Sequence, residues 1–509
     1  MRFGQSGPGS EALNMDMIYR STRGGAKEVT ASQAILQGLA PDGGLYVPTS
    51  MPKLTKTMSE LSQMTYRETA FEVLSLFLTD YTAEELKACI DAAYDSKFDT
   101  EEIAPLVQAD GAYYLELFHG ATIAFKDMAL SILPHLMTTA ARKNGIKDEI
   151  VILTATSGDT GKAALAGFAD VPGTKIIVFY PKHGVSAVQE RQMVTQKGDN
   201  TCVIGITGNF DDAQTGVKKM FGDAELAAEL AGKGYRFSSA NSINIGRLVP
   251  QIVYYTYAYA KLLAEGHIAD GEKINVTVPT GNFGNILAAY YAKKIGVPID
   301  KLICASNTNK VLFDFFETGT YDRNREFVLT SSPSMDILIS SNLERLIYHI
   351  AGDDSAVTAA LMKNLTEGGR YDITGEMRAR LSDFCSGYAT EEDTAEAIRT
   401  LYDRTGYVID PHTAVASFVY RKYAASSHDA ARTVIASTAS PFKFARSVMA
   451  AIDGKASDED DFALIDRLSA TANVALPAAI VELKTAPVRH DIVCETADMK
   501  QEVRRFLDR

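Results

Sequence analysis

The chain has 509 residues, of which 46% are hydrophobic and 23% charged, which is the composition of a folded globular protein. This length exceeds what one hydrophobic core can hold, so we expect roughly two to four domains. The net charge of −13 argues against binding to nucleic acids or to anionic membranes, because both need a basic protein surface.

The cysteines and histidines show no pattern of a disulfide framework or of a metal site. Five cysteines are widely spaced, without a CxxC pair or a zinc-like spacing to histidine, and no HExxH motif occurs. We therefore predict no metal ion and a reducing, cytoplasmic setting. No apolar run reaches the ~20 residues of a membrane span, and residues 1–16 carry no pattern of a secretion signal.

The N-terminal region, residues 17–111, is predicted to be mostly helical. Apolar residues recur at helical spacing over residues 65–77 and again over residues 81–93. Before these helices lies LAPDGGLYVP at residues 39–48, whose Pro-Asp-Gly-Gly core indicates a turn.

From residue 112 to about residue 307, short apolar runs alternate with helical stretches. We expect strands at residues 112–118, 150–155, 175–180, 201–206, 274–279 and 302–306. We expect helices at residues 129–144, 162–169, 187–196, 213–220, 248–264 and 286–294. Because the strands are apolar on both faces, they suit a parallel sheet that helices cover on both sides. The alternation predicts a doubly wound α/β fold.

The last third of the chain is less regular. Helices are expected at residues 394–403, 413–423 and 499–507. Thr394 is the expected N-cap of the first, and Asp410-Pro411 is the expected start of the second. A charged stretch at residues 453–461 indicates a surface linker, and a small C-terminal module is expected at residues 456–509.

A candidate catalytic lysine lies in the segment ELFHGATIAFKD, residues 116–127, after a predicted strand. Lys126 stands between an aromatic and an acidic residue, and partial desolvation there would lower its pKa toward the neutral amine of Schiff-base chemistry. A surface lysine at a helix start is the alternative. His119, the only histidine in a candidate loop, is either catalytic or a hydrogen-bonded structural residue.

Two glycine-bearing loops follow predicted strands and open predicted helices. TATSGDTGKAAL, at residues 154–165, suits either an anion-binding loop or an ordinary tight turn, and it lacks the glycine and serine or threonine of a Walker motif. PTGNFGNILAA, at residues 279–289, can turn several backbone N–H groups toward a phosphate. It is not GxGxxG, so a dinucleotide site is not predicted.

Nine motifs occur in an order that is specific to one family. They are YRSTRGG (19–25), ILQGLAPDGGLYVP (35–48), ELFHGATIAFKD (116–127), TSGDTG (156–161), NSINIGR (241–247), GNFGN (281–285), SPSMD (332–336), DPHTAVA (410–416) and STASPFKF (437–444). Together they resemble the threonine synthases, a family of fold-type II pyridoxal-phosphate enzymes, over most of the chain. The long N-terminal region resembles the bacterial–fungal subgroup.

The resemblance implies an α/β fold of the tryptophan synthase β-like type. It would have two doubly wound parallel-sheet domains, a helical N-terminal region and a small C-terminal module. Residues 112–455 would form the catalytic core, with a nested smaller α/β domain at about residues 145–240.

The resemblance also implies how the cofactor, pyridoxal 5'-phosphate, is held. Lys126 would bind it as a Schiff base and later move protons. Thr438 would hydrogen-bond the pyridine nitrogen. The cofactor phosphate would be held by Gly281, Asn282, Phe283, Gly284 and Asn285.

Substrate contacts follow from two further motifs. Residues implied to bind the substrate carboxylate or to lie beside the ring oxygen are Thr156, Ser157, Asp159 and Thr160. Asn241 and Arg247 would bind the substrate phosphate, Arg247 with two parallel hydrogen bonds. The sequence departs from the family's Thr-Ala-His-Pro pattern at Ser440, which leaves Thr438 unchanged.

The implied activity is that of a carbon–oxygen lyase that converts O-phospho-L-homoserine and water to L-threonine and phosphate, the last step of threonine biosynthesis, as a monomer or homodimer. A threonine dehydratase or a β-replacing synthase is the alternative within the fold, but neither needs a second phosphate site such as Asn241 and Arg247. A non-catalytic metabolite-binding homologue is disfavoured by Lys126 and Thr438. A nucleotide-binding regulator is disfavoured because both nucleotide motifs are absent.

Overall fold

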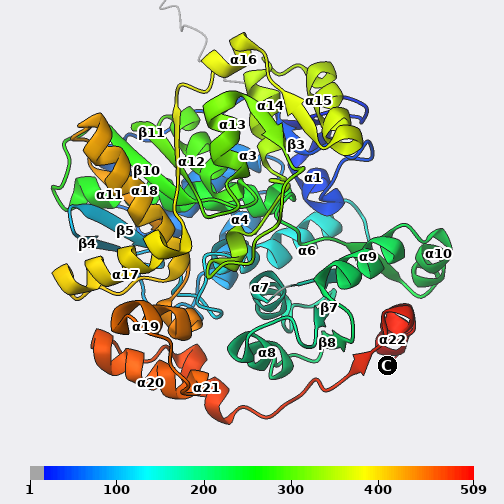
Figure 1. Ribbon diagram of the computed structural model, residues 1–509. Helices are drawn as coiled ribbons and strands as arrows, with labels where there is room; N and C mark the ends of the chain where they lie inside the picture. Colours follow the sequence, from blue (N-terminus) through cyan, green and yellow to red (C-terminus); the bar gives the residue numbers. More distant parts are fainter. Residues whose placement is uncertain (1–15, 157, 509) are drawn as a thin grey trace, which may run out of the picture.

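Two mainly parallel sheets organise the chain (Figure 1). The computed structural model describes residues 16–156 and 158–508. The larger sheet has the strand order β14-β11-β10-β15-β5-β4, and the smaller sheet has the order β16-β8-β7-β6-β9. All neighbours are parallel except β4, which runs antiparallel to β5. The predicted α/β fold with two parallel-sheet domains is confirmed.

The strands form where apolar runs are covered on both faces. The larger sheet contains β4 (Leu106–Ala109), β5 (Ala112–Glu116), β10 (Ile274–Pro279), β11 (Ile299–Ser306), β14 (Phe384–Tyr388) and β15 (Thr433–Ser437). The smaller sheet contains β6 (Glu149–Ala155), β7 (Thr174–Pro181), β8 (Thr201–Ile206), β9 (Tyr235–Ser238) and β16 (Val493–Cys494). Every residue of β8, β10 and β15 is buried, as parallel strands between two helical layers require.

Helices connect and cover these strands. Around the smaller sheet lie α7 (Asp159–Phe168), α8 (Ala187–Val194), α9 (Phe210–Phe221) and α10 (Ala224–Gly232). The other helices of residues 112–430 are α5 (Asp127–Leu130), α6 (Leu133–Lys143), α11 (Ile245–Ala264), α12 (Gly284–Ile295), α13 (Val311–Thr318), α14 (Leu343–Ile350), α15 (Ser355–Gly368), α16 (Gly375–Ala379), α17 (Glu391–Thr405) and α18 (Pro411–Ser427). A two-stranded antiparallel sheet of β12 (Thr320–Asp322) and β13 (Arg370–Asp372) lies between α13 and α16 in the chain.

Two predicted helix boundaries are wrong for local reasons. The single helix expected at residues 129–144 is two helices, because Pro134 in the first turn of α6 lacks the N–H that a continuous helix would use. Thr394 is not an N-cap. Thr390 caps α17 instead, since its hydroxyl accepts from the Asp393 N–H and the Asp393 carboxylate accepts from the Thr390 N–H. The predicted start of α18 is confirmed, with Asp410 as its N-cap.

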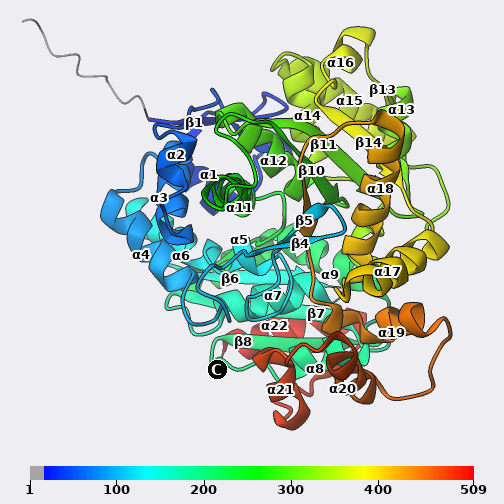
Figure 2. The same cartoon turned by 90° about the vertical axis from the view of Figure 1, so that its left-hand side faces the viewer.

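The N-terminal region combines helices with a small sheet that the sequence did not indicate. It contains β1 (Ile18–Ser21), β2 (Val29–Thr30), β3 (Tyr46–Pro48), α1 (Ala31–Gln37), α2 (Met58–Leu61), α3 (Tyr66–Phe77) and α4 (Ala83–Ala93). The three strands pair antiparallel in the order β2-β1-β3. Figure 2 shows α11 among α1, α3 and α12, and α11 is apolar and buried nearly all round, as expected of a helix inside the core.

The last residues pack on two different parts of the molecule. The helices α19 (Ala445–Asp453), α20 (Asp461–Ala472) and α21 (Ala478–Thr485) join the apolar cluster beside α17 and α18. From α21 the chain crosses to the smaller sheet (Figure 1), where β16 extends the sheet and α22 (Met499–Leu507) packs on α9. Residues 456–508 therefore have no single core of their own.

The topology directs several loops toward one place. The parallel strands β5, β10 and β15 are adjacent or near neighbours in one sheet, so the loops after them leave from the same edge. In the smaller sheet the chain order reverses at β6, and ligands of such sheets bind beyond the carboxyl ends of strands at this reversal. Within the described residues, no helix combines the length and hydropathy of a membrane-spanning segment.

Candidate functional site

Lys126 lies at the start of α5, in the loop that follows β5. Backbone hydrogen bonds tie this loop to the segment after β15: the Phe125 N–H donates to the Thr438 carbonyl at 2.8 Å, and the Ser440 N–H donates to the Ile123 carbonyl at 3.0 Å. Ile123 has a φ of +53°, a conformation that β-branched residues rarely adopt. Lys126 and Thr438 are therefore fixed relative to each other by the backbone.

The amine of Lys126 has unusual surroundings. Its Nζ donates to the Ser334 hydroxyl at 3.2 Å. Loss of hydration lowers the pKa of Lys126 to about 8, and the cations of Lys443 and Arg247 act in the same direction, while Asp159 opposes them. This amine is neutral far more readily than an ordinary lysine, which suits the predicted nucleophile.

The glycine loop after β10 is shaped for close approach. A Cβ at Gly281 would lie 2.6 Å from the Ser334 carbonyl oxygen, so a larger residue would displace the neighbouring segment. Phe283 has a φ of +65° and buries its ring against Phe316, so the loop presents backbone and not this side chain. The loop opens α12, whose N-terminus favours an anion.

Asn285 and Asn282 differ in their exposure. Asn285 is buried and accepts from the Tyr255 hydroxyl, whereas its Nδ2 has no partner among the described residues. Asn282 is exposed, and its carbonyl accepts from the Asn342 N–H at 3.0 Å. The unpaired buried donor of Asn285 is a group that a ligand would satisfy.

Thr156 holds the loop after β6 in its conformation. Its hydroxyl accepts from the Gly158 and Gly161 N–H groups at 3.0 and 2.9 Å. Asp159 and Thr160 begin α7, and Ser157 lies outside the described residues. The Asp159 carboxylate pairs with other side chains, so Asp159 itself can meet a substrate carboxylate only through its backbone N–H.

Arg247 begins α11 and is almost fully buried. Its Nη1 donates to the Ala240 carbonyl at 2.7 Å, its Nε has no partner within the described residues, and burial lowers the pKa of Arg247 to about 10. The neighbouring Asn241 is exposed. Asn342 joins this segment to the glycine loop. Its Nδ2 donates to the Ser242 carbonyl at 3.3 Å, and its backbone N–H donates to the Asn282 carbonyl in the glycine loop. Two sets of donors that suit an anion, at Arg247 and at the glycine loop, are therefore linked through Asn342.

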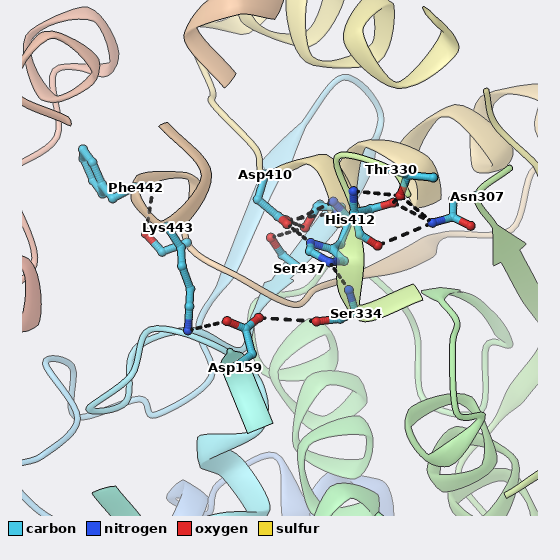
Figure 3. A network of polar contacts seen from close by, with 12 residues as sticks. Asp159, Asn307, Thr330, Ser334, Asp410, His412, Ser437, Phe442 and Lys443 are labelled. Carbon is cyan, nitrogen blue, oxygen red and sulfur yellow. Dashed lines mark hydrogen bonds and ion pairs between the residues drawn. The ribbon is translucent and has the colours of Figure 1, made fainter. Parts of the chain in front are cut away.

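Four residues of the site were not assigned a role from the sequence: Ser334, Asp410, His412 and Lys443 (Figure 3). The Ser334 N–H donates to the His412 Nε2 at 3.2 Å, and the His412 Nδ1 lies 2.6 Å from the Asp410 carboxylate. Because Nε2 accepts from the Ser334 N–H, the ring nitrogen that donates is Nδ1, which faces Asp410. These residues fix the segment that contacts Lys126.

The donors present fit a phosphate-bearing aldehyde such as pyridoxal phosphate. A helix start with glycines and the unpaired Asn285 amide suits its phosphate, and the amine of Lys126 suits its aldehyde. Thr438, which directly follows β15 and is buried, offers a neutral hydroxyl for a ring nitrogen. The unpaired Nε of Arg247 remains for a second anion.

His119 belongs to a structural ion cluster at the edge of this region. Its Nδ1 lies 2.6 Å from the Asp99 carboxylate and its Nε2 lies 2.8 Å from the Glu116 carboxylate. Burial alone would lower the pKa of His119, but the hydrogen bonds to both carboxylates outweigh it and raise the pKa to about 9. Both ring nitrogens are occupied, which favours the structural alternative for this histidine over the catalytic one.

We expect His119→Gln to destabilise the protein in a pH-dependent way. A raised folded-state pKa contributes stability that is full below the ordinary value of 6.5 and is lost as the pH rises through about 9. The loss in the free energy of unfolding should be about 2 kcal/mol at pH 6 and should shrink steadily toward pH 10. Urea unfolding of both proteins across this range measures it. A loss that is constant with pH would contradict the charged-histidine assignment.

Comparisons with known proteins indicate the family of the chain and its cofactor. The family described as "Pyridoxal-phosphate dependent enzyme" matches residues 99–439, and those described as "Threonine synthase N terminus" and "Threonine synthase, C-terminal" match residues 18–94 and 413–506. Threonine synthase of Saccharomyces cerevisiae is 36% identical over 472 residues, which are 87% of this chain and 90% of that protein.

Two further similarities bear on cofactor and length. The crystal structure of pyridoxal-phosphate-bound threonine synthase from Brucella melitensis superposes with a TM-score of 0.86 at 36% identity, covering 97% of this chain and all of that one. Threonine synthase-like 1 of Pongo abelii is 41% identical over 441 residues, which are 84% of this chain. The chain spans only 58% of the length of that relative.

Proposed function

The chain belongs to the threonine synthase family of pyridoxal-phosphate-dependent lyases, and from this premise we propose that it converts O-phospho-L-homoserine and water to L-threonine and phosphate. Similarity extends both to yeast threonine synthase and to threonine synthase-like 1, so the reaction itself is a proposal about this chain.

The observation that carries the proposal is a second set of anion-binding groups. The glycine loop at the start of α12 suits the phosphate of the cofactor. Arg247, beside that loop, keeps a buried Nε without a partner in the described part of the chain. A dehydratase acts on an amino acid without a phosphate and has no use for this second set, whereas a phosphorylated substrate would satisfy it.

The residues of this chain would bind and orient the substrate at three points. Arg247 and Asn241 hold the phosphate, and the backbone N–H groups at the start of α7 hold the carboxylate. Thr438 meets the ring nitrogen of the cofactor with a neutral hydroxyl. When bound, pyridoxal phosphate supplies an electron-withdrawing ring that stores the electrons left by removal of the α proton.

Lys126 is the base and acid of the proposed reaction. With a pKa of about 8, it keeps a usable fraction of neutral amine near neutral pH and can take the α proton of the substrate and return it. Overall, the bond from Cγ to the phosphate oxygen breaks, a proton leaves Cβ and one is added at Cγ. The oxygen of water bonds to Cβ, and its released proton balances the departing phosphate.

The test is to incubate the cofactor-loaded protein with O-phospho-L-homoserine and to measure phosphate, threonine and ammonia. We expect phosphate and threonine in equal amounts and no ammonia. O-Phospho-L-serine, one methylene shorter, is the matched control and should yield no threonine. Ammonia in place of threonine would move the assignment to a dehydratase-like activity, and the absence of all three products would favour the non-catalytic homologue.

A further inference from the structure

Lys443 is a second lysine in the site, and the proposed reaction gives it no role. Its side chain is fully buried, and its Nζ lies 3.0 Å from the Asp159 Oδ1 and donates to the Thr122 carbonyl at 3.0 Å. It lies in the short helix Pro441–Phe444 that directly follows Thr438 and Ser440. A buried ammonium group is costly unless it is paired, so its fixed position calls for an explanation.

Asp159 lies between Lys126 and Lys443. Figure 3 shows its carboxylate in contact with Lys443 and with Ser334. Its Oδ1 is shared by Lys443 and by the Gln189 amide at 3.1 Å, and its Oδ2 lies 3.3 Å from the Ser334 hydroxyl. Lys126 reaches the carboxylate only through that hydroxyl, to which its Nζ donates at 3.2 Å. The carboxylate is thus committed to Lys443 and is one hydroxyl group away from Lys126.

We propose that Lys443 is a positioning residue that neutralises Asp159 and holds its carboxylate away from Lys126, so that the amine of Lys126 stays in its neutral, reactive form. The proposal rests on the role of Lys126 proposed above, but not on the identity of the substrate. Without Lys443, the carboxylate would be free to pair with Lys126 and to hold it as an ammonium ion.

The other charged groups around Lys126 cannot replace Lys443. Asp127 is buried and bound by the Thr122 N–H and hydroxyl at 2.8 and 2.6 Å, and burial raises its pKa. Arg247 is a cation that also disfavours an ammonium at Lys126, but its Nη1 donates to the Ala240 carbonyl and not to Asp159. Burial opposes ionisation of Asp159, yet the cations of Lys443 and Lys126 hold the pKa of Asp159 well below its usual range. A permanently charged carboxylate needs a permanent partner.

The experiment measures the protonation of Lys126 and not turnover. The full chain is freed of cofactor, and the rate at which added pyridoxal phosphate regains its visible absorption band is recorded against pH. This rate follows the neutral fraction of Lys126, so the wild-type profile should have its midpoint near pH 8. For Lys443→Met we expect the midpoint of this profile to rise by at least one pH unit. Attachment of pyridoxal phosphate at pH 7 should then be about tenfold slower than in the wild type.

Charge and packing are separated by three further variants. Asp159→Asn/Lys443→Met removes both charges and should return the midpoint to about the wild-type value, while Asp159→Asn alone should lower it. Lys162→Met is the matched control, because Lys162 is a nearby lysine that donates to Gln196 and not to Asp159. An unchanged midpoint in Lys443→Met, or an equal shift in the double variant, would overturn the proposal. If Lys443→Met does not fold, an unchanged midpoint in Asp159→Asn overturns it.

Discussion

Lys126→Ala is expected to lower threonine formation by about 1,000-fold or more and to remove the visible absorption band of the loaded protein. The physical reason is that one amine both holds the cofactor and moves the α proton. Two other lysines of this region have partners of their own: the Lys443 Nζ pairs with Asp159 and donates to the Thr122 carbonyl, and the Lys162 Nζ donates to Gln196. Absorption spectra and product assays on the same sample measure both effects.

The control for this variant is Lys97→Ala, since Lys97 is an exposed lysine paired with Asp95 far from the glycine loops in the chain. It should keep the band and the activity. After borohydride treatment, mass spectrometry should find the cofactor label on Lys126 in the wild type and in the control. Threonine formation that survives in Lys126→Ala, or a label on another lysine, would show that the assignment is wrong.

The parallel sheets could be predicted because their strands carry their own signal. The runs that form β8 and β10 are mostly apolar and each is followed by Thr-Gly, so their bounds were predicted as the structure has them. The short strand β15, whose five residues are all buried, was missed because so short an apolar run gains its strand conformation only from pairing with β5 and β10. The pairing of β16 with β8 joins segments nearly 300 residues apart and leaves no local trace.

The candidate site, too, could be predicted only in part from the sequence. Glycine loops after strands and a lysine between Phe125 and Asp127 are local patterns, and the sequence therefore indicated them. The contact between Lys126 and Ser334 joins residues 208 positions apart, and Ser334 depends in turn on His412. For Lys443 the sequence shows only that it stands between two phenylalanines; its burial, and hence its need for an acidic partner, follows from the structure. Which partner it has follows only from the fold.

The second large effect is expected at Arg247. For Arg247→Met we expect kcat/KM for O-phospho-L-homoserine to fall roughly 100-fold, because about 3 kcal/mol of charge-assisted hydrogen bonding to the substrate phosphate is lost. The affinity for pyridoxal phosphate and the visible band should stay unchanged, since the cofactor phosphate is assigned to the separate loop at the start of α12. Steady-state kinetics and a cofactor titration distinguish the two phosphates.

Arg247→Lys tests whether geometry matters beyond charge. Lysine keeps the positive charge but lacks the planar guanidinium with its several fixed N–H donors. Arg247→Lys should therefore have an activity between those of Arg247→Met and the wild type. The surroundings of Arg247 support this, because one Nη1 hydrogen is committed to the Ala240 carbonyl while the buried Nε has no partner among the described residues. An ammonium group at the end of a straight chain cannot place donors at both positions. If Arg247→Met instead weakened cofactor binding as much as it raised KM, the two anion-binding sets would be one. The case for a phosphorylated substrate would then lose the observation that carries it.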